Sequence, residues 1–179
     1  MKRLLLITIS VALLTSCSGG EETIGFLRQN LGAFSIDIPE TWRKVNQENY
    51  GNTIPPETVV LYLNKIEGDD FIQNVNIVKE SLNTDANGLE YAKANMLLGS
   101  KAIIDYRAVS REEGAINGMQ TVLHVFRARN LSTDPLRYYT QAYFVQDRVG
   151  YTATCIAKDE DLAQQQLCEQ IVKSFRFGS

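Results

Sequence analysis

The segment LRYYTQAYFVQDRVGYTATCIAKDEDLAQQQLCEQIVKSF (residues 136–175) decides the fold of this chain. Its first part predicts two β-strands, 136–146 and 150–157, joined by a hairpin through DRVG. A helix is then predicted from about residue 159 to 175. Its apolar residues recur at the i, i+3, i+4, i+7 spacing of a stripe that packs on a sheet: Cys168, Ile171, Val172 and Phe175.

The rest of the chain repeats this combination of strands and a separate helix. Alternation and turn residues predict strands at AFSIDIP (33–39), VVLYLN (59–64), FIQNVNIVKES (71–81), IIDYRAVSRE (103–112) and QTVLHVFRAR (120–129). Asn117-Gly118 is a strong hairpin signal between the last two of these strands. Hairpin-linked strands with separate helices define an α+β domain on an antiparallel sheet, expected over residues 31–179.

A second helix is expected between the early and late strands. Thr84 or Asp85 can cap its start, and GSKA (99–102) is interpreted as its stop. Its apolar stripe is expected at spacings of three and four residues: Leu89, Ala92, Met96 and Leu97.

The N-terminus has the pattern of a bacterial lipoprotein signal peptide over residues 1–16. Two basic residues precede the apolar run 4–14, which is too short to span a bilayer. The following LTSC resembles a lipobox, which implies cleavage before Cys17 and lipid on its sulfur. Residues 17–30 are then a flexible, lipid-anchored linker. The alternative is an ordinary signal peptide in which Cys17 has no special role.

A lipidated Cys17 would hold the domain on a membrane without a spanning helix, since two or more acyl chains give stable anchoring. The expected location is the cell envelope, facing the periplasm or the exterior. Ser18 follows the cysteine in place of the Asp that resembles an inner-membrane retention signal, which favours the outer membrane where one exists.

Charge excludes one class of partner. Removing Lys2 and Arg3 from the 18 basic residues leaves 16 against 21 acidic ones, a net charge of −5 for the mature chain. No Lys/Arg cluster occurs in the sequence, and nucleic-acid binding needs clustered cations. We therefore expect no nucleic-acid partner.

Cys155 and Cys168 are predicted to form a disulfide. Alternation places Cys155 on one face of its strand with Tyr151, Ala153 and Ala157, and Cys168 lies on the apolar stripe of the next helix. These surfaces face each other, and exported compartments are often oxidising. Two free buried thiols are the alternative.

Three segments carry a resemblance to a known family: FSIDIPETWRKV (34–45), QNVNIVKES (73–81) and YTATCIAKDEDLAQQQLCEQIVKSFRF (151–177). They resemble PsbP-like and DcrB-like domains, which open with a Phe-x-Ile-x-x-Pro-x-x-Trp strand and turn. The resemblance implies an antiparallel sheet of about six or seven strands sandwiched by helices. It implies no single activity, because members include photosystem accessory proteins, envelope lipoproteins and protein-binding domains.

The sequence contains no recognisable catalytic residue, metal ligand set or cofactor motif. His124 is the only histidine, and within a strand of apolar neighbours a structural role is favoured over a functional one. Asp69-Asp70 could hold a hard cation, but adjacent carboxylates in a turn are more often solvated.

One aromatic and basic cluster is a candidate binding surface, because tyrosine and arginine are enriched at binding hot spots. The alternative is that the tyrosines cover the sheet beneath a helix. The cluster consists of Tyr138, Tyr139, Tyr143, Arg127, Arg129 and Arg137, with Tyr151 beside it.

Together these patterns predict an exported, lipid-anchored, non-enzymatic domain that binds an envelope protein partner or assists assembly. The alternative is a small-ligand or metal-binding envelope lipoprotein, and a lipoprotein enzyme comes third. A deep pocket with converging polar groups would favour the ligand carrier, and a broad surface would favour the partner.

Overall fold

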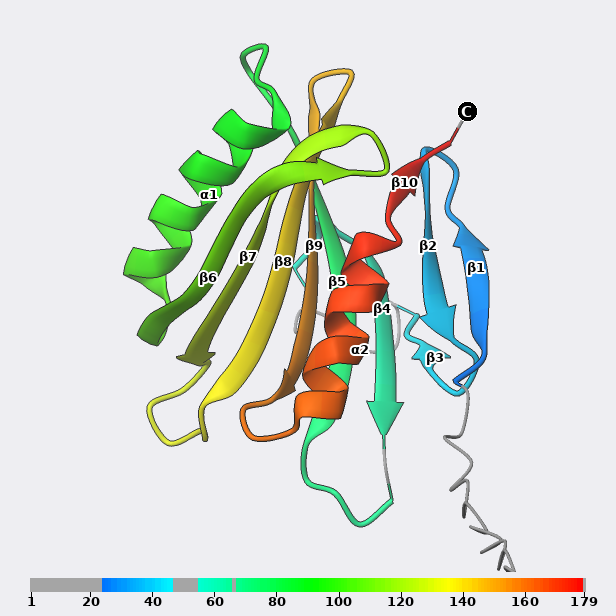
Figure 1. The fold of residues 1–179 in the computed structure, drawn as a ribbon, viewed down its shortest axis with the longest axis vertical. Helices are drawn as coiled ribbons and strands as arrows, with labels where there is room; N and C mark the ends of the chain where they lie inside the picture. The colour runs from blue at the N-terminus through cyan, green and yellow to red at the C-terminus, as the bar shows by residue number, and fades with distance from the viewer. Residues whose placement is uncertain (1–23, 47–54, 66, 179) are drawn as a thin grey trace, which may run out of the picture.

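The computed structural model describes residues 24–46, 55–65 and 67–178 and contains two antiparallel sheets (Figure 1). The larger sheet has seven strands in the order β3 (Arg43–Lys44), β4 (Thr58–Lys65), β5 (Ile72–Ser81), β9 (Val149–Lys158), β8 (Arg137–Gln146), β7 (Met119–Arg129) and β6 (Ile104–Ile116). The smaller has three, in the order β1 (Phe26–Asn30), β2 (Phe34–Pro39) and β10 (Arg176–Phe177).

Helices α1 (Gly88–Ala102) and α2 (Leu162–Lys173) lie on opposite faces of the large sheet (Figure 1). Strand β8 shows why, since its alternate residues point to the two layers. Tyr143 packs with the residues of α1, whereas Ala142 and Phe144 pack with those of α2 and the small sheet. The predicted α-β-α sandwich of the PsbP-like type is confirmed.

The main core lies between the large sheet, α2 and the small sheet. Phe34 and Ile36 of β2 are buried there together with Trp42, which the turn after Pro39 returns to the core. Phe175, just after α2, stacks on Phe144 of β8 with ring centroids 4.1 Å apart. Strand β2, near the start of the described chain, and the C-terminal end of the chain therefore close the same core.

The disulfide between Cys155 and Cys168 is confirmed. Cys155 lies on β9 and Cys168 on α2, both side chains are fully buried, and their Cα atoms are 5.2 Å apart. The bond joins the central part of the sheet to the helix that covers it.

The hairpin at Asn117-Gly118 forms as predicted. Both residues have positive φ, +49° and +81°, as a two-residue turn with the twist of the strands requires. The Asn117 side chain also donates hydrogen bonds to the carbonyl oxygens of Lys173 (3.0 Å) and Phe175 (2.7 Å). This single residue thus shapes the β6–β7 turn and fastens it to the end of α2.

The ends of both helices differ from expectation. Asn87 caps α1 in place of Thr84 or Asp85: its side chain accepts from the amides of Leu89 and Glu90, and the Glu90 carboxylate accepts from the Asn87 amide. Leu97 is 57% exposed and does not belong to the buried stripe. Helix α2 begins at Leu162, because the Asp161 side chain accepts from the Gln164 amide and ends the preceding turn.

The folded part also begins earlier than the boundary expected at residue 31. Strand β1 lies inside the range assigned to the linker, and it pairs with β2 from Phe26–Pro39 to Asn30–Ser35. Strand β1 was not expected because its polar residues carry a weak hydrophobic signal. Backbone pairing with β2 holds it in the sheet. Residues 1–16 and Cys17 lie outside the described residues.

No helix in the described ranges has both the length and the apolar character needed to cross a membrane.

Candidate functional site

The candidate site lies on the α1 face of the large sheet, and it exists because only the first half of α1 touches the sheet closely. Gly88, Tyr91 and Ala92 are the buried residues of this helix. A Cβ atom on Gly88 would lie 2.1 Å from the carbonyl oxygen of Gln120, and one on Gly150 would lie 2.5 Å from the Tyr91 ring. These two glycines allow the start of α1 to dock on the sheet.

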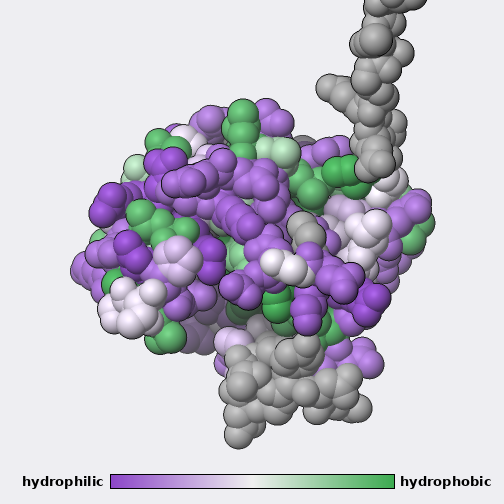
Figure 2. Space-filling model, turned by 90° about the horizontal axis from the view of Figure 1, so that it is seen from below, coloured by the Kyte–Doolittle hydropathy of each residue, from purple (hydrophilic) through white to green (hydrophobic). Residues whose placement is uncertain are grey.

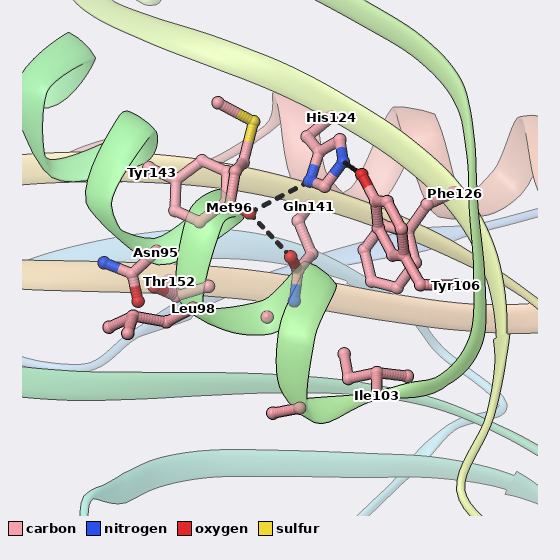
Figure 3. Close-up of a pocket in the computed structure, with 12 residues that line it drawn as sticks. Asn95, Met96, Leu98, Ile103, Tyr106, His124, Phe126, Gln141, Tyr143 and Thr152 are labelled. Carbon is pink, nitrogen blue, oxygen red and sulfur yellow. Dashed lines mark hydrogen bonds between the residues drawn. The ribbon is translucent and has the colours of Figure 1, made fainter.

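The second half of α1 stands off the sheet and leaves a cavity of about 240 Å³ beneath it, which we call the inner slot (Figure 3). Its walls come from α1, from the start of β6 and from β7, β8 and β9. The residues that line it are Asn95, Met96, Leu98, Gly99, Ala102, Ile103, Tyr106, His124, Phe126, Gln141, Tyr143 and Thr152.

A wider groove of about 540 Å³ continues from the inner slot over β9 and β5, and we call it the outer groove. The two share Asn95, Ile103, Phe126, Gln141 and Thr152, so they form one continuous trough beside α1. The outer groove is lined in addition by Glu57, Asn76, Val78, Glu80, Tyr91, Tyr139, Thr154 and Ile156.

A chain of hydrogen bonds crosses the floor of the trough (Figure 3). Tyr143 donates its hydroxyl proton to Gln141 Oε1 (2.7 Å), so it accepts from His124 Nδ1 (3.1 Å). The other ring nitrogen, Nε2, then accepts from the Tyr106 hydroxyl (2.9 Å). The chain of hydrogen bonds continues from Gln141, whose Nε2 donates to Thr154 Oγ1 (2.9 Å).

His124 is neutral in this network. Burial lowers its pKa to about 4, and the positive charge of Arg111 adds to the effect. Burial also raises the pKa of Tyr143 and of Tyr91. At neutral pH the described residues that line the inner slot therefore carry no formal charge, and the slot offers hydrogen bonds and apolar contacts.

Strand alternation divides the predicted tyrosine and arginine surface. Tyr139, Tyr143 and Arg137 belong to the α1 face of β8, whereas Tyr138 points to the α2 face beside Arg127, whose guanidinium lies 5.8 Å from its ring centroid. The six residues do not form one surface, because neighbours along a strand face opposite layers.

Burial gives most of these tyrosines a packing role, as the alternative proposed. Tyr139, Tyr143 and Tyr151 are buried, and Tyr139 stacks on Phe126 with centroids 4.8 Å apart. Tyr138 keeps partial exposure.

The three arginines of this cluster are engaged elsewhere. Arg127 pairs with Asp159, Arg129 pairs with Asp105 (2.7 Å), and Arg137 lies over the Phe71 ring at 4.4 Å.

The two aspartates of the β4–β5 turn do not point to a cation site. Asp69 pairs with Lys158 (2.5 Å) and accepts from the Phe71 amide (2.9 Å), and these contacts, the first above all, lower the pKa of its carboxyl. Within the described residues no group of three or more His, Cys, Asp or Glu side chains is placed to hold a metal.

The end of the molecule that carries the β7–β8, β9–α2 and β4–β5 connections is mainly polar, and a cavity of about 590 Å³ beside β3, β4 and the β4–β5 connection is lined mostly by polar and charged side chains. Figure 2 shows that hydrophilic side chains dominate this face and that hydrophobic ones form separate small patches. Leu131 in the β7–β8 connection and Leu162 at the start of α2 are 63% and 66% exposed. Single exposed leucines of this kind are normal on protein surfaces.

The trough was not predicted from the sequence, and neither were the positions of Tyr106, Gln141 and Asn95 in its lining. One signal was available: Gln141, Thr152 and Thr154 alternate with apolar residues on neighbouring strands. That pattern indicates a sheet face that no helix covers. Nothing in the sequence indicated that α1 would cover only part of the face.

The similarity of this chain to known proteins lies in its fold. No family model and no curated protein sequence matches the chain. Solved structures do match: PsbP of Synechocystis sp. PCC 6803 (CyanoP) has a TM-score of 0.63 and 16% identity over 92% of this chain and 99% of its own. The fold is PsbP-like.

Two further structures have the same architecture at low identity. LpqN of Mycobacterium tuberculosis, described as involved in cell envelope biogenesis, gives a TM-score of 0.57 and 11% identity over 88% of this chain and 92% of its own. The Ran-binding protein Mog1p of Saccharomyces cerevisiae gives 0.55 and 11% over 86% and 96%. At such identity the likeness concerns the fold.

Proposed function

We propose that this chain is a lipid-anchored, non-enzymatic domain that binds a protein partner at the cell envelope or assists assembly there. The observation that carries the proposal is the outer groove, a broad strip of sheet beside α1 that no helix of the described part covers. Most sheet faces in a sandwich are buried under another layer. A sheet face left open in such a fold is suited to contact with another molecule.

The chemistry of the outer groove suits a protein surface. Asn76, Thr152 and Gln141 offer hydrogen-bonding groups, and Tyr139 and Ile156 supply apolar area between them. The cores of protein interfaces are depleted in charge and enriched in aromatic residues. Its two carboxylates, on Glu57 and Glu80, would lie at the rim of such an interface.

The envelope address rests on Cys17 and on the fold. The LTSC motif resembles a lipobox, and LpqN, with the same fold, is described as involved in cell envelope biogenesis. The non-enzymatic character is supported by the inner slot, where His124 and its two tyrosines are hydrogen-bonded to one another. A catalytic base must have a ring nitrogen within hydrogen-bonding reach of a proton on the substrate, whereas both ring nitrogens of His124 are hydrogen-bonded to tyrosines.

Site-specific photocrosslinking in cells that make the full chain tests the partner role. A photoreactive residue at Asn76, in the outer groove, should give one discrete protein adduct. The same residue at Glu112, exposed on the edge strand β6, is the matched control and should give none. Equal adducts from Asn76 and Glu112, or no adduct from Asn76, would contradict the proposal.

A further inference from the structure

The inner slot differs from the outer groove in being bounded on two sides, by α1 above and by the sheet below. Its volume of about 240 Å³ can be compared with that of an engineered apolar cavity of about 150 Å³, which binds benzene. The slot therefore has room for a molecule of one or two rings, or for a short alkyl chain. It is too narrow for a folded partner.

The helix above the slot loses stability by leaving this space open. Gly99 lies inside α1, where glycine costs about 1 kcal/mol relative to alanine. A Cβ atom at Gly99 would meet nothing closer than Ile103 Cδ1 at 3.9 Å, so packing does not require the glycine. Gly99 and the neighbouring Ala102 both line the slot, and larger side chains at these positions would fill it.

The lining of the slot selects for an uncharged molecule. Met96, Leu98, Ile103 and Phe126 supply apolar contacts. At the other side the hydrogen-bonded pair of His124 and Tyr106 is neutral, so a charged group entering here would lose its water without gaining a counter-charge.

One polar group of the lining has a free acceptor. Asn95 donates its Nδ2 to the carbonyl oxygen of Tyr91 (3.1 Å), which leaves its Oδ1 without a partner among the described hydrogen bonds. A ligand hydroxyl or N–H group could donate to this oxygen.

From these observations we infer that the inner slot is a binding site for an uncharged, mainly apolar small molecule that carries one hydrogen-bond donor. The site is formed by the second half of α1 over β6, β7 and β8, with Gly99 and Ala102 keeping it open. This inference is independent of the lipid anchor and of the protein partner.

Fluorescence titration of the purified full chain with N-phenyl-1-naphthylamine tests the site. This probe is neutral, has an aromatic core and carries one N–H donor. We expect saturable, one-to-one fluorescence enhancement, and binding weaker by at least about tenfold for the anionic analogue 1-anilinonaphthalene-8-sulfonate. Equal affinity for the two probes would overturn the inference.

Variants locate the binding. Gly99→Leu should fill the slot and weaken probe binding by about tenfold or more. Leu97→Ser, on an exposed position of the same helix that does not line the slot, is the control and should leave binding unchanged. The apolar N-terminal run is the same in every variant, so a difference between variants reports on the slot.

Two further outcomes would overturn the inference: full probe binding by Gly99→Leu, or an equal loss in Leu97→Ser. If Gly99→Leu does not fold, as judged by circular dichroism, Ala102→Met serves as the second filling variant. Its probe affinity is read by the same criterion.

Discussion

His124 is held between the hydroxyl groups of Tyr106 and Tyr143, and its neutral form is the one that fits. The pKa is lowered to about 4 in the fold, against an ordinary value of 6.5. Below pH 6.5 the unfolded chain therefore binds a proton that the folded chain does not. Stability must fall as the pH drops from 6.5 towards 4, and this loss ends below the folded pKa.

The size of this effect is measurable because the chain has one histidine. Between pH 7 and pH 4.5 we expect the free energy of unfolding to fall by about 2.5 kcal/mol through this group. Urea titrations of the wild type and of His124→Gln at both pH values isolate the contribution of His124 to the free energy of unfolding, since the carboxylates titrate alike in the two proteins. An imidazole NMR signal that titrates near 6.5 would contradict the prediction.

Asn117 combines two tasks that substitutions can separate. Asn117→Gly keeps the left-handed turn but loses the hydrogen bonds to Lys173 and Phe175, and we expect a cost of about 1–2 kcal/mol. Asn117→Ala loses the hydrogen bonds and also disfavours the left-handed turn. It should cost about 1 kcal/mol more than Asn117→Gly, because a Cβ disfavours positive φ. Chemical denaturation gives both values, and equal stability of the two variants would show that the turn conformation is not limiting.

At the scale of elements, the bond between Cys155 and Cys168 joins β9 to α2 across a sequence separation of 13 residues. Closing a loop of this length restricts the unfolded chain and stabilises the fold by about 3 kcal/mol. The double variant Cys155→Ala, Cys168→Ala should lose roughly that amount in urea unfolding. Alkylation of the unfolded, unreduced wild type should label neither cysteine, and two labelled thiols would refute the bond.

Two glycines of α1 should respond in opposite directions to alanine. Gly88→Ala places a methyl group against the Gln120 carbonyl oxygen and must push the helix off the sheet, so we expect destabilisation by about 2 kcal/mol or more. The Cβ of Gly99→Ala meets only Ile103 Cδ1, at an ordinary contact distance of 3.9 Å, so this change should raise stability by up to about 1 kcal/mol. Thermal unfolding followed by circular dichroism compares them, and a stable Gly88→Ala would mean that α1 docks less closely than the structure shows.

The elements themselves were predictable to the extent that their signals are local. The β8–β9 hairpin, the Asn117-Gly118 turn and the facing positions of Cys155 and Cys168 follow from period-two and period-3.6 patterns. Strand β1 was missed because its polar residues lack alternation. The trough was missed for a different reason: the contact at Gly88 sets how α1 lies on the sheet, and this contact joins residues distant in sequence.

For the whole molecule, the decisive experiment concerns its attachment. Cys17→Ser should release the domain from the membrane fraction or leave the uncleaved precursor, because the lipid that we propose on the Cys17 sulfur can then not be attached. Fractionation of cells that express each form measures this, with Ser18→Ala as the matched control. A cleaved Cys17→Ser protein that still sediments with membranes would contradict the lipid anchor.

The middle of the large sheet is the pairing of β5 with β9, from Asn74–Ile156 to Ser81–Val149. This ladder joins the first half of the chain to nearly its last strand, so β3, β4 and β5 have no central neighbour until the end of the chain arrives. Because β3 has only two residues, this fragment is little more than the β4–β5 hairpin, and an isolated hairpin is at best marginally stable in water. The order of synthesis therefore postpones closure of the sheet until β9 has been made. If the chain is exported as we propose, it can cross a membrane as an unfolded polypeptide before the sheet forms.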